Sequence, residues 1–150
     1  MSQLKPLSEI TEKVQFLAKS KAGDSIMTGR EFVEAYGRSG QPLDSEPNRT
    51  IATAGGDVQT AYSKLHSVYM RVKNEKEAPA NEFKISTENT HSLNTKVICA
   101  DLEIAATKLS EAATKMQNVD ASLASELQKI SEDILNHKSR ISSTGIVVLN

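Results

Sequence analysis

Apolar residues recur at steps of three and four through the last third of this chain, so the fold has to bury a long helical face. That spacing puts the residues on one side of an α-helix, and alternating threes and fours are typical of a coiled-coil seam. Such a face packs against other helices of the same chain or of a partner. The seam comprises Leu102, Ala105, Leu109, Ala112, Met116, Val119, Leu123, Leu127, Ile130, Ile134, His137 and Ile141.

The helical pattern around this seam extends over residues 87–142. A straight helix of that length would measure about 80 Å. Between Met116 and Leu127 the steps are three, four and four, a stutter that unwinds a coiled coil locally without ending the helix. We therefore expect one long helix. The alternative is a break near residues 118–120, with Asp120 as the N-cap of a second helix.

Three more helices are predicted upstream, over residues 7–22, 28–37 and 47–76. The first has apolar residues at three-four spacing and is followed by a glycine, which commonly ends a helix. The second begins with a capping box, in which the side chains of Thr28 and Glu31 each accept a hydrogen bond from the other residue's backbone. The third keeps its apolar rhythm throughout.

A glycine pair, Gly55 and Gly56, lies inside the third of these helices. Two glycines cost a helix about 2 kcal/mol relative to two alanines. Because the apolar rhythm runs through the pair, we expect one helix that either kinks there or lets another helix approach closely. A helix starting at Asp57 is the alternative.

Two segments flank the long C-terminal pattern. Residues 82–86 fit neither a helix nor a strand clearly, and Ser86 or Thr87 is expected to cap the helix that follows. The tail, residues 145–150, is apolar and β-branched and breaks the helical pattern. We expect it to fold back over the end of the bundle. Alternatively, it forms a short strand or a peptide that docks on a neighbour's sheet edge or groove.

The composition is that of an ordinary water-soluble domain. The chain has 150 residues, of which 38% are apolar and 25% charged, and its net charge is −1. Near-neutrality argues against a nucleic-acid partner, which selects for a basic surface. The sequence has no stretch approaching the roughly 20 apolar residues of a membrane span, and its start lacks the apolar core of a signal peptide. We expect synthesis in the cytoplasm, with export by a route without a cleaved signal as an alternative.

Residues with reactive side chains do not form a recognisable active-site or metal-site motif. Cys99 lies in an apolar stretch and is expected to be a small buried hydrophobe. Asp133 and His137 have helical spacing, but zinc sites need three or four ligands. His137 falls on the seam, where we expect a tolerated edge position; a polar residue that sets the helix register is the alternative. We predict no catalytic residues, no metal and no cofactor.

These observations predict an all-α protein: one domain, residues 1–150, built as an antiparallel helical bundle with a long C-terminal helix of coiled-coil character. The expected function is non-enzymatic, as an adaptor, a small chaperone or a subunit of a larger bacterial or viral assembly. It would bind a protein partner, or itself, through a helix face. The predicted partner-binding residues are Val119, Leu123, Leu127, Ile130, Ile134, Ile141, Ile146, Val148 and Leu149.

Two other functions are compatible with the sequence. One is a secreted or translocated bacterial effector without a cleavable signal, which the composition rich in serine, threonine and asparagine permits. The other is a ligand-binding or enzymatic helical bundle. Its pocket would be lined by Tyr62, His66, Tyr69 and His91, the first three of which share one helix face.

Overall fold

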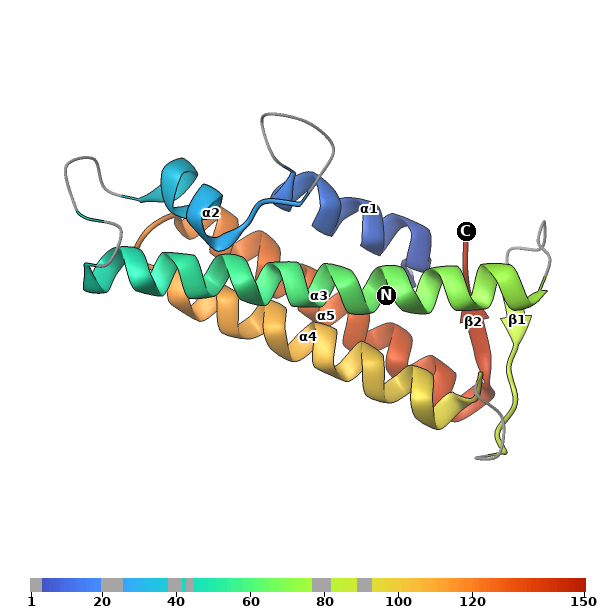
Figure 1. Ribbon diagram of the computed structural model, residues 1–150. Coiled ribbons are helices and arrows are strands. Elements are labelled where there is room, and N and C mark those ends of the chain that lie inside the picture. The colour runs from blue at the N-terminus through green and yellow to red at the C-terminus, as the bar shows by residue number, and fades with distance from the viewer. Residues whose placement is uncertain (1–3, 20–25, 38–41, 43–44, 77–81, 89–92) are drawn as a thin grey trace.

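The computed structural model describes residues 4–19, 26–37, 42, 45–76, 82–88 and 93–150. Most of these residues are helical, which confirms the all-α prediction, and a two-stranded sheet lies at one end of the bundle (Figure 1). The elements in chain order are α1 (Leu7–Ala18), α2 (Gly29–Tyr36), α3 (Glu46–Lys76), β1 (Glu82–Lys84), α4 (Thr95–Met116), α5 (Ala121–Thr144) and β2 (Ile146–Val148).

The long helices α3, α4 and α5 run in alternating directions along the bundle (Figure 1). α4 packs extensively on both α3 and α5. α1 and α2 follow one another along α3 and together occupy the place of a fourth long helix (Figure 1). α1 packs more extensively on α3 than on α5, and a groove is left between α1 and α5. The predicted antiparallel bundle is confirmed.

The apolar rhythm of α3 forms one wall of the core. Each of its seven predicted positions is at most 1% exposed, so the three-four spacing identified the buried face correctly. Two of the seven, Ala54 and Ala61, are small, which lets the neighbouring helices approach closely there. The seven are Ile51, Ala54, Val58, Ala61, Leu65, Val68 and Val72.

The glycine pair lies inside an unbroken α3, so the predicted single helix is confirmed and the alternative start at Asp57 is wrong. The two glycines have different surroundings. A Cβ atom added to Gly55 would lie 2.7 Å from Cβ of Phe32 in α2, whereas one added to Gly56 would have no atom within 4 Å. The missing side chain at Gly55 is therefore what admits α2.

The helix that crosses α3 at this point begins as predicted. The Thr28 hydroxyl accepts a hydrogen bond from the Glu31 N–H at 3.2 Å, and the Glu31 carboxylate accepts one from the Thr28 N–H at 3.2 Å. This capping box satisfies backbone donors that the first helical turn leaves unpaired. α2 covers Gly29–Tyr36, one residue shorter at each end than predicted.

The C-terminal seam belongs to two helices, and the expected single long helix is wrong. α4 ends at Met116, and the Asp120 carboxylate accepts a hydrogen bond from the Leu123 N–H at 3.0 Å at the start of α5. The alternative, a break with Asp120 as N-cap, is confirmed. The turn folds α5 back on α4, so the two halves of the seam are buried in one bundle. Helices of 22 and 24 residues also fit beside α3.

Replacing Asp120 with alanine should lower the free energy of unfolding by about 1 kcal/mol, because α5 loses the acceptor for an N-terminal N–H group. Asp120→Asn is the matched control, since an asparagine side chain caps a helix about as well. Urea unfolding followed by circular dichroism measures both. Equal destabilisation by the two substitutions would show that the negative charge, and not the cap, accounts for the contribution of Asp120.

Two other predicted helix boundaries are wrong. α1 ends at Ala18 instead of residue 22, because Lys19 is extended and bridges Ile26; residues 20–22 lie outside the described part. The last helical segment starts at Thr95 instead of 87. Its N-cap is Asn94, whose side-chain oxygen accepts a hydrogen bond from the Val97 N–H at 2.9 Å, and not Ser86 or Thr87. Ser86 instead forms a parallel bridge with Asn94.

The apolar tail covers the end of the bundle, as expected, and does so as a strand. β2 pairs with β1 in antiparallel register, Glu82 opposite Val148 and Lys84 opposite Ile146. Gly145, at φ 74°, ends α5 in the left-handed conformation that glycine adopts without strain, and so turns the chain into β2. The strand partner is thus the same chain.

Hydrogen bonds tie this tail to the start of α1. The Ser8 N–H donates to the Leu149 carbonyl at 2.9 Å, and the Val148 N–H donates to Nε2 of His137 at 3.2 Å. Nδ1 of His137 lies 3.0 Å from the Lys5 carbonyl. We call these five residues the clasp. It joins α1, α5 and β2 at one end of the molecule.

Candidate functional site

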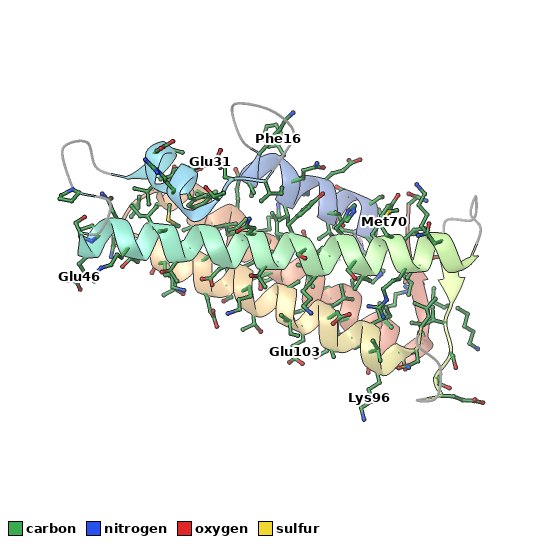
Figure 2. The ribbon with its side chains drawn as sticks, viewed as in Figure 1. Phe16, Glu31, Glu46, Met70, Lys96 and Glu103 are labelled. Atoms are coloured by element: carbon green, nitrogen blue, oxygen red, sulfur yellow. The ribbon has the colours of Figure 1, made fainter. Side chains whose placement is uncertain are left out.

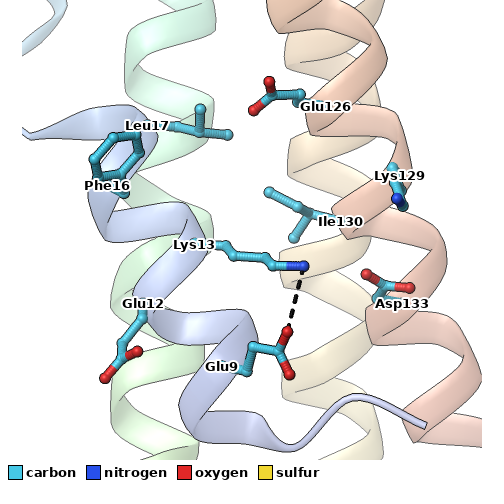
Figure 3. Close-up of a pocket in the computed structure, with 9 residues that line it drawn as sticks. All are labelled: Glu9, Glu12, Lys13, Phe16, Leu17, Glu126, Lys129, Ile130 and Asp133. Carbon is cyan, nitrogen blue, oxygen red and sulfur yellow. Dashed lines mark ion pairs between the residues drawn. The ribbon is translucent and has the colours of Figure 1, made fainter. Parts of the chain in front are cut away.

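A groove of about 620 Å³ runs between α1 and α5 (Figure 3). Its lining repeats at helical spacing on both walls. On α1, Glu9, Lys13 and Leu17 lie on the side towards α5, and Glu12 and Phe16 lie at the outer edge (Figure 3). We call it the α1–α5 groove. The lining residues are Glu9, Glu12, Lys13, Phe16, Leu17, Glu126, Lys129, Ile130 and Asp133.

The apolar part of the groove comes from one turn of each helix. Ile130 of α5 belongs to the buried seam and is 4% exposed, and Leu17 of α1 is partly buried beside it (Figure 3). Phe16 lies at the rim and is 80% exposed. Figure 2 shows the Phe16 side chain projecting away from the other helices. A phenyl ring with that much exposure gains no packing energy in the isolated chain.

Carboxylates outnumber ammonium groups around this apolar centre. Glu9 is paired with Lys13 at 3.5 Å (Figure 3) and with Lys5 at 3.7 Å. Among the described residues, the carboxylates of Glu12, Glu126 and Asp133 form no ion pair. Glu126 and Asp133 are therefore available to a cation in the groove, whereas Glu12 projects away from α5 (Figure 3).

Burial and two nearby carboxylates affect the phenol of Tyr36. Burial raises its pKa, and the nearby carboxylates of Asp120 and Glu126 raise it further. Glu126 thus contributes to a negative potential both in the groove and towards α2. The phenol stays protonated at neutral pH.

Most of the predicted partner-binding residues are buried within the chain. Leu123, Leu127, Ile134 and Ile141 are at most 6% exposed and pack in the bundle core. Ile130 is the member of the predicted set that lines the α1–α5 groove. A role in partner binding stays a prediction for all of them, but in this conformation the four core residues contact their own chain.

The remaining predicted residues lie at the two ends of the bundle. Val119, in the connection between α4 and α5, is 42% exposed. Ile146 and Val148 are partly buried in β2, and Leu149 is fully buried in the clasp. The structure therefore does not bring the predicted set together on one surface.

Phe16 was not among the predicted site residues, although the sequence contains a signal for it. The buried face of the first helix is set by Leu7, Ile10 and Val14, and Phe16 falls off that face. An aromatic residue on the polar side of an amphipathic helix predicts an exposed aromatic side chain.

His137 is completely buried, so its interpretation as an edge position is wrong. A carbonyl only accepts and an amide only donates, so its ring donates from Nδ1 to Lys5 and accepts at Nε2 from Val148. That pattern requires the neutral ring. Burial lowers its pKa, the hydrogen bond to Lys5 opposes this shift, and the charge of Arg140 adds to it.

Cys99 is partly buried, and its thiol lies 3.6 Å from the Lys138 carbonyl. Burial raises its pKa, which keeps it as the unreactive thiol. Among the described residues, no group of three or more histidine, cysteine, aspartate or glutamate side chains is arranged to hold a metal ion.

The predicted tyrosine–histidine pocket is only partly testable. Tyr62 and His66 stack with ring centroids 5.5 Å apart, and His66 is exposed. Tyr69 is partly buried on the same helix. His91, the fourth predicted lining residue, lies outside the described residues.

Comparison with protein-family models, curated proteins and solved structures gives no significant match. None of the described helices has the length and the apolar content that crossing a membrane requires.

Proposed function

We propose that this chain is a non-enzymatic binding protein, acting as an adaptor, a small chaperone or a subunit of a larger assembly, and that its partner occupies the α1–α5 groove. The observation that carries the proposal is Phe16, an aromatic side chain 80% exposed at the rim of a groove with an apolar floor. Burying a phenylalanine stabilises a complex by about 1.5–3 kcal/mol. Aromatic residues beside a pocket are the commonest anchors of protein interfaces.

The rest of the groove has the layout of an interface. Leu17 and Ile130 form a small apolar centre, and charged side chains surround it. Interfaces generally combine an apolar core with a polar rim in this way. The groove volume of about 620 Å³ is large enough to receive several side chains of a partner.

Photocrosslinking in the native host cells tests the proposal. p-Benzoylphenylalanine at position 16 keeps an aromatic side chain at the groove, and the same residue at Val97, 38% exposed on α4, is the control. We expect an adduct of discrete mass from position 16 and none from position 97. Equal labelling at the two positions, or none at position 16, would contradict the groove as the partner site.

Light scattering on the purified chain separates two kinds of partner. A monomer that crosslinks to another protein from position 16 supports an adaptor or chaperone. A dimer whose subunits crosslink to each other through position 16 supports self-assembly through the same groove. Both results fit a binding protein, and they identify the partner as foreign or as a second copy.

A further inference from the structure

We infer that the α1–α5 groove accepts a basic amphipathic helix of another protein, with apolar residues towards Phe16, Leu17 and Ile130 and lysine or arginine side chains towards the surrounding carboxylates. This inference rests on the proposed function and adds the chemical class of the partner. Its two parts, helical shape and positive charge, come from separate observations.

The shape comes from the walls of the groove. They are two helices, with lining residues from Glu9 to Leu17 on α1 and from Glu126 to Asp133 on α5. Each stretch extends over about two turns, or roughly 11 Å. An amphipathic helix presents apolar side chains one turn apart, and a groove between two helices receives such a row. The partner helix would supply the closure that α1 and α5 lack along their junction.

The charge comes from the carboxylates beside the apolar centre. Glu126 and Asp133 lie about one turn before and one turn after Ile130 on α5. On α1 the Glu12 carboxylate projects away from α5 (Figure 3), so the unpaired carboxylates that flank the apolar centre come from α5. None of the three forms an ion pair among the described residues.

The lysines of the groove offset only part of this charge. Lys13 reaches across the groove towards α5 and is paired with Glu9 at 3.5 Å (Figure 3), and Lys5 is paired with the same carboxylate at 3.7 Å. Lys129 is the counter-charge on α5, and Figure 3 shows it farther from α1 than Ile130 is. A partner with acidic flanks would therefore meet like charge, whereas lysine or arginine side chains would cover the apolar centre with their methylene stems and pair at their ends.

The inference is tested by measuring how tightly three synthetic peptides bind to the full-length chain. Each has about 18 residues, enough to form a helix in isolation, with leucine along one face. The other face carries lysine, glutamine or glutamate. Fluorescence anisotropy measures the dissociation constants at two salt concentrations. We expect the Leu/Lys peptide to bind about tenfold more tightly than Leu/Gln at low salt, Leu/Glu to bind most weakly, and the difference to shrink at high salt.

Variants then locate the binding. Phe16→Ala should raise the dissociation constant of the Leu/Lys peptide about tenfold, as expected for an interface anchor. It should not change the midpoint of thermal unfolding of the chain. Val97→Ala is the matched control and should leave binding unchanged. The double variant Glu126→Gln, Asp133→Asn should bind the Leu/Lys peptide more weakly and should bind the Leu/Gln peptide with unchanged affinity.

Three results would overturn the inference, and they separate it from the proposed function. If all three peptides bind equally and Phe16→Ala weakens their binding, the groove is a binding site but does not select positive charge. If Phe16→Ala does not change the binding of the Leu/Lys peptide, the peptide adsorbs to acidic surface in general, and the groove is not its binding site. If no peptide binds but position 16 still crosslinks to a partner in cells, the partner is not a basic helix, yet the proposed function stands.

Discussion

Replacing Gly55 with alanine should lower the free energy of unfolding by about 1–3 kcal/mol, whereas the same change at Gly56 should raise it by about 1 kcal/mol. The new methyl group at position 55 would lie 2.7 Å from Cβ and 2.9 Å from Cγ of Phe32, and 3.3 Å from Cα of Gly29. α2 would have to move away from α3. At position 56 a Cβ atom has no neighbour within 4 Å, so the higher helix propensity of alanine acts alone.

Urea unfolding of the two variants measures this difference directly. The glycines are adjacent in the same helix, so each variant controls for the effect of the other on helix propensity. In thermal unfolding, a change of 1 kcal/mol corresponds to roughly 2–4 °C for a chain of this size. If both alanine variants were stabilised to the same extent, the close packing of α2 at Gly55 would be wrong.

Replacing His137 with leucine should lower the free energy of unfolding by about 2–4 kcal/mol above pH 7. Leucine fills most of the volume of the ring but makes no hydrogen bond. The Lys5 carbonyl and the Val148 N–H would then lose the partners that His137 gives them in the clasp. Buried polar groups without a partner carry the full cost of leaving water.

The same residue should make the protein less stable in acid. Burial lowers the pKa of His137 in the folded chain below its ordinary value of 6.5. Below about pH 6.5 the unfolded chain takes up a proton that the folded chain does not, so unfolding becomes more favourable. This contribution to stability is present above that pH and is lost as the pH falls towards the lowered, folded value. The loss is at most about 1.4 kcal/mol per pH unit.

Urea unfolding between pH 5 and 8 separates this contribution from those of other groups. His137→Leu should show a smaller decline on acidification than the unchanged chain. His66→Gln is the control, because it removes an exposed histidine that lies outside the clasp. An identical pH dependence in the unchanged chain and His137→Leu would contradict a buried neutral imidazole.

The periodicity of apolar residues predicted which segments are helical better than it predicted where each helix begins and ends. α3 was predicted to within one residue, because its rhythm has seven members and every one is buried. The break before α5 was misjudged because the spacing across it, from Met116 to Leu127, suits a continuous helix as well as a tight turn. The local signal that decides is the Asp120 cap, which forms in the folded chain.

β1 was not predicted, because three residues at Glu82–Lys84 carry little pattern of their own. Their partner, β2, is more than sixty residues away in the sequence, and short strands depend on that pairing. For the same reason His137 looked like a tolerated exception on an apolar seam. Its partners, Lys5 and Val148, come from opposite ends of the chain.

The candidate site was only partly predictable. Ile130 was among the predicted partner-binding residues and lines the α1–α5 groove, but its neighbours on the seam are buried. Phe16 was readable as an aromatic residue off the buried face of its helix. The groove itself depends on how closely α1 approaches α5, and no local pattern in either helix specifies that distance.

The clasp also bears on the order in which the chain folds. Lys5 and His137 are 132 residues apart, whereas only the short connection 117–120 separates α4 from α5. Closing a long loop costs more entropy than closing a short one, so the α4–α5 hairpin should form early and the clasp last. Contacts made after the transition state slow unfolding without speeding folding. We therefore expect substitutions in the clasp to change mainly the rate of unfolding, and substitutions between α4 and α5 to change mainly the rate of folding.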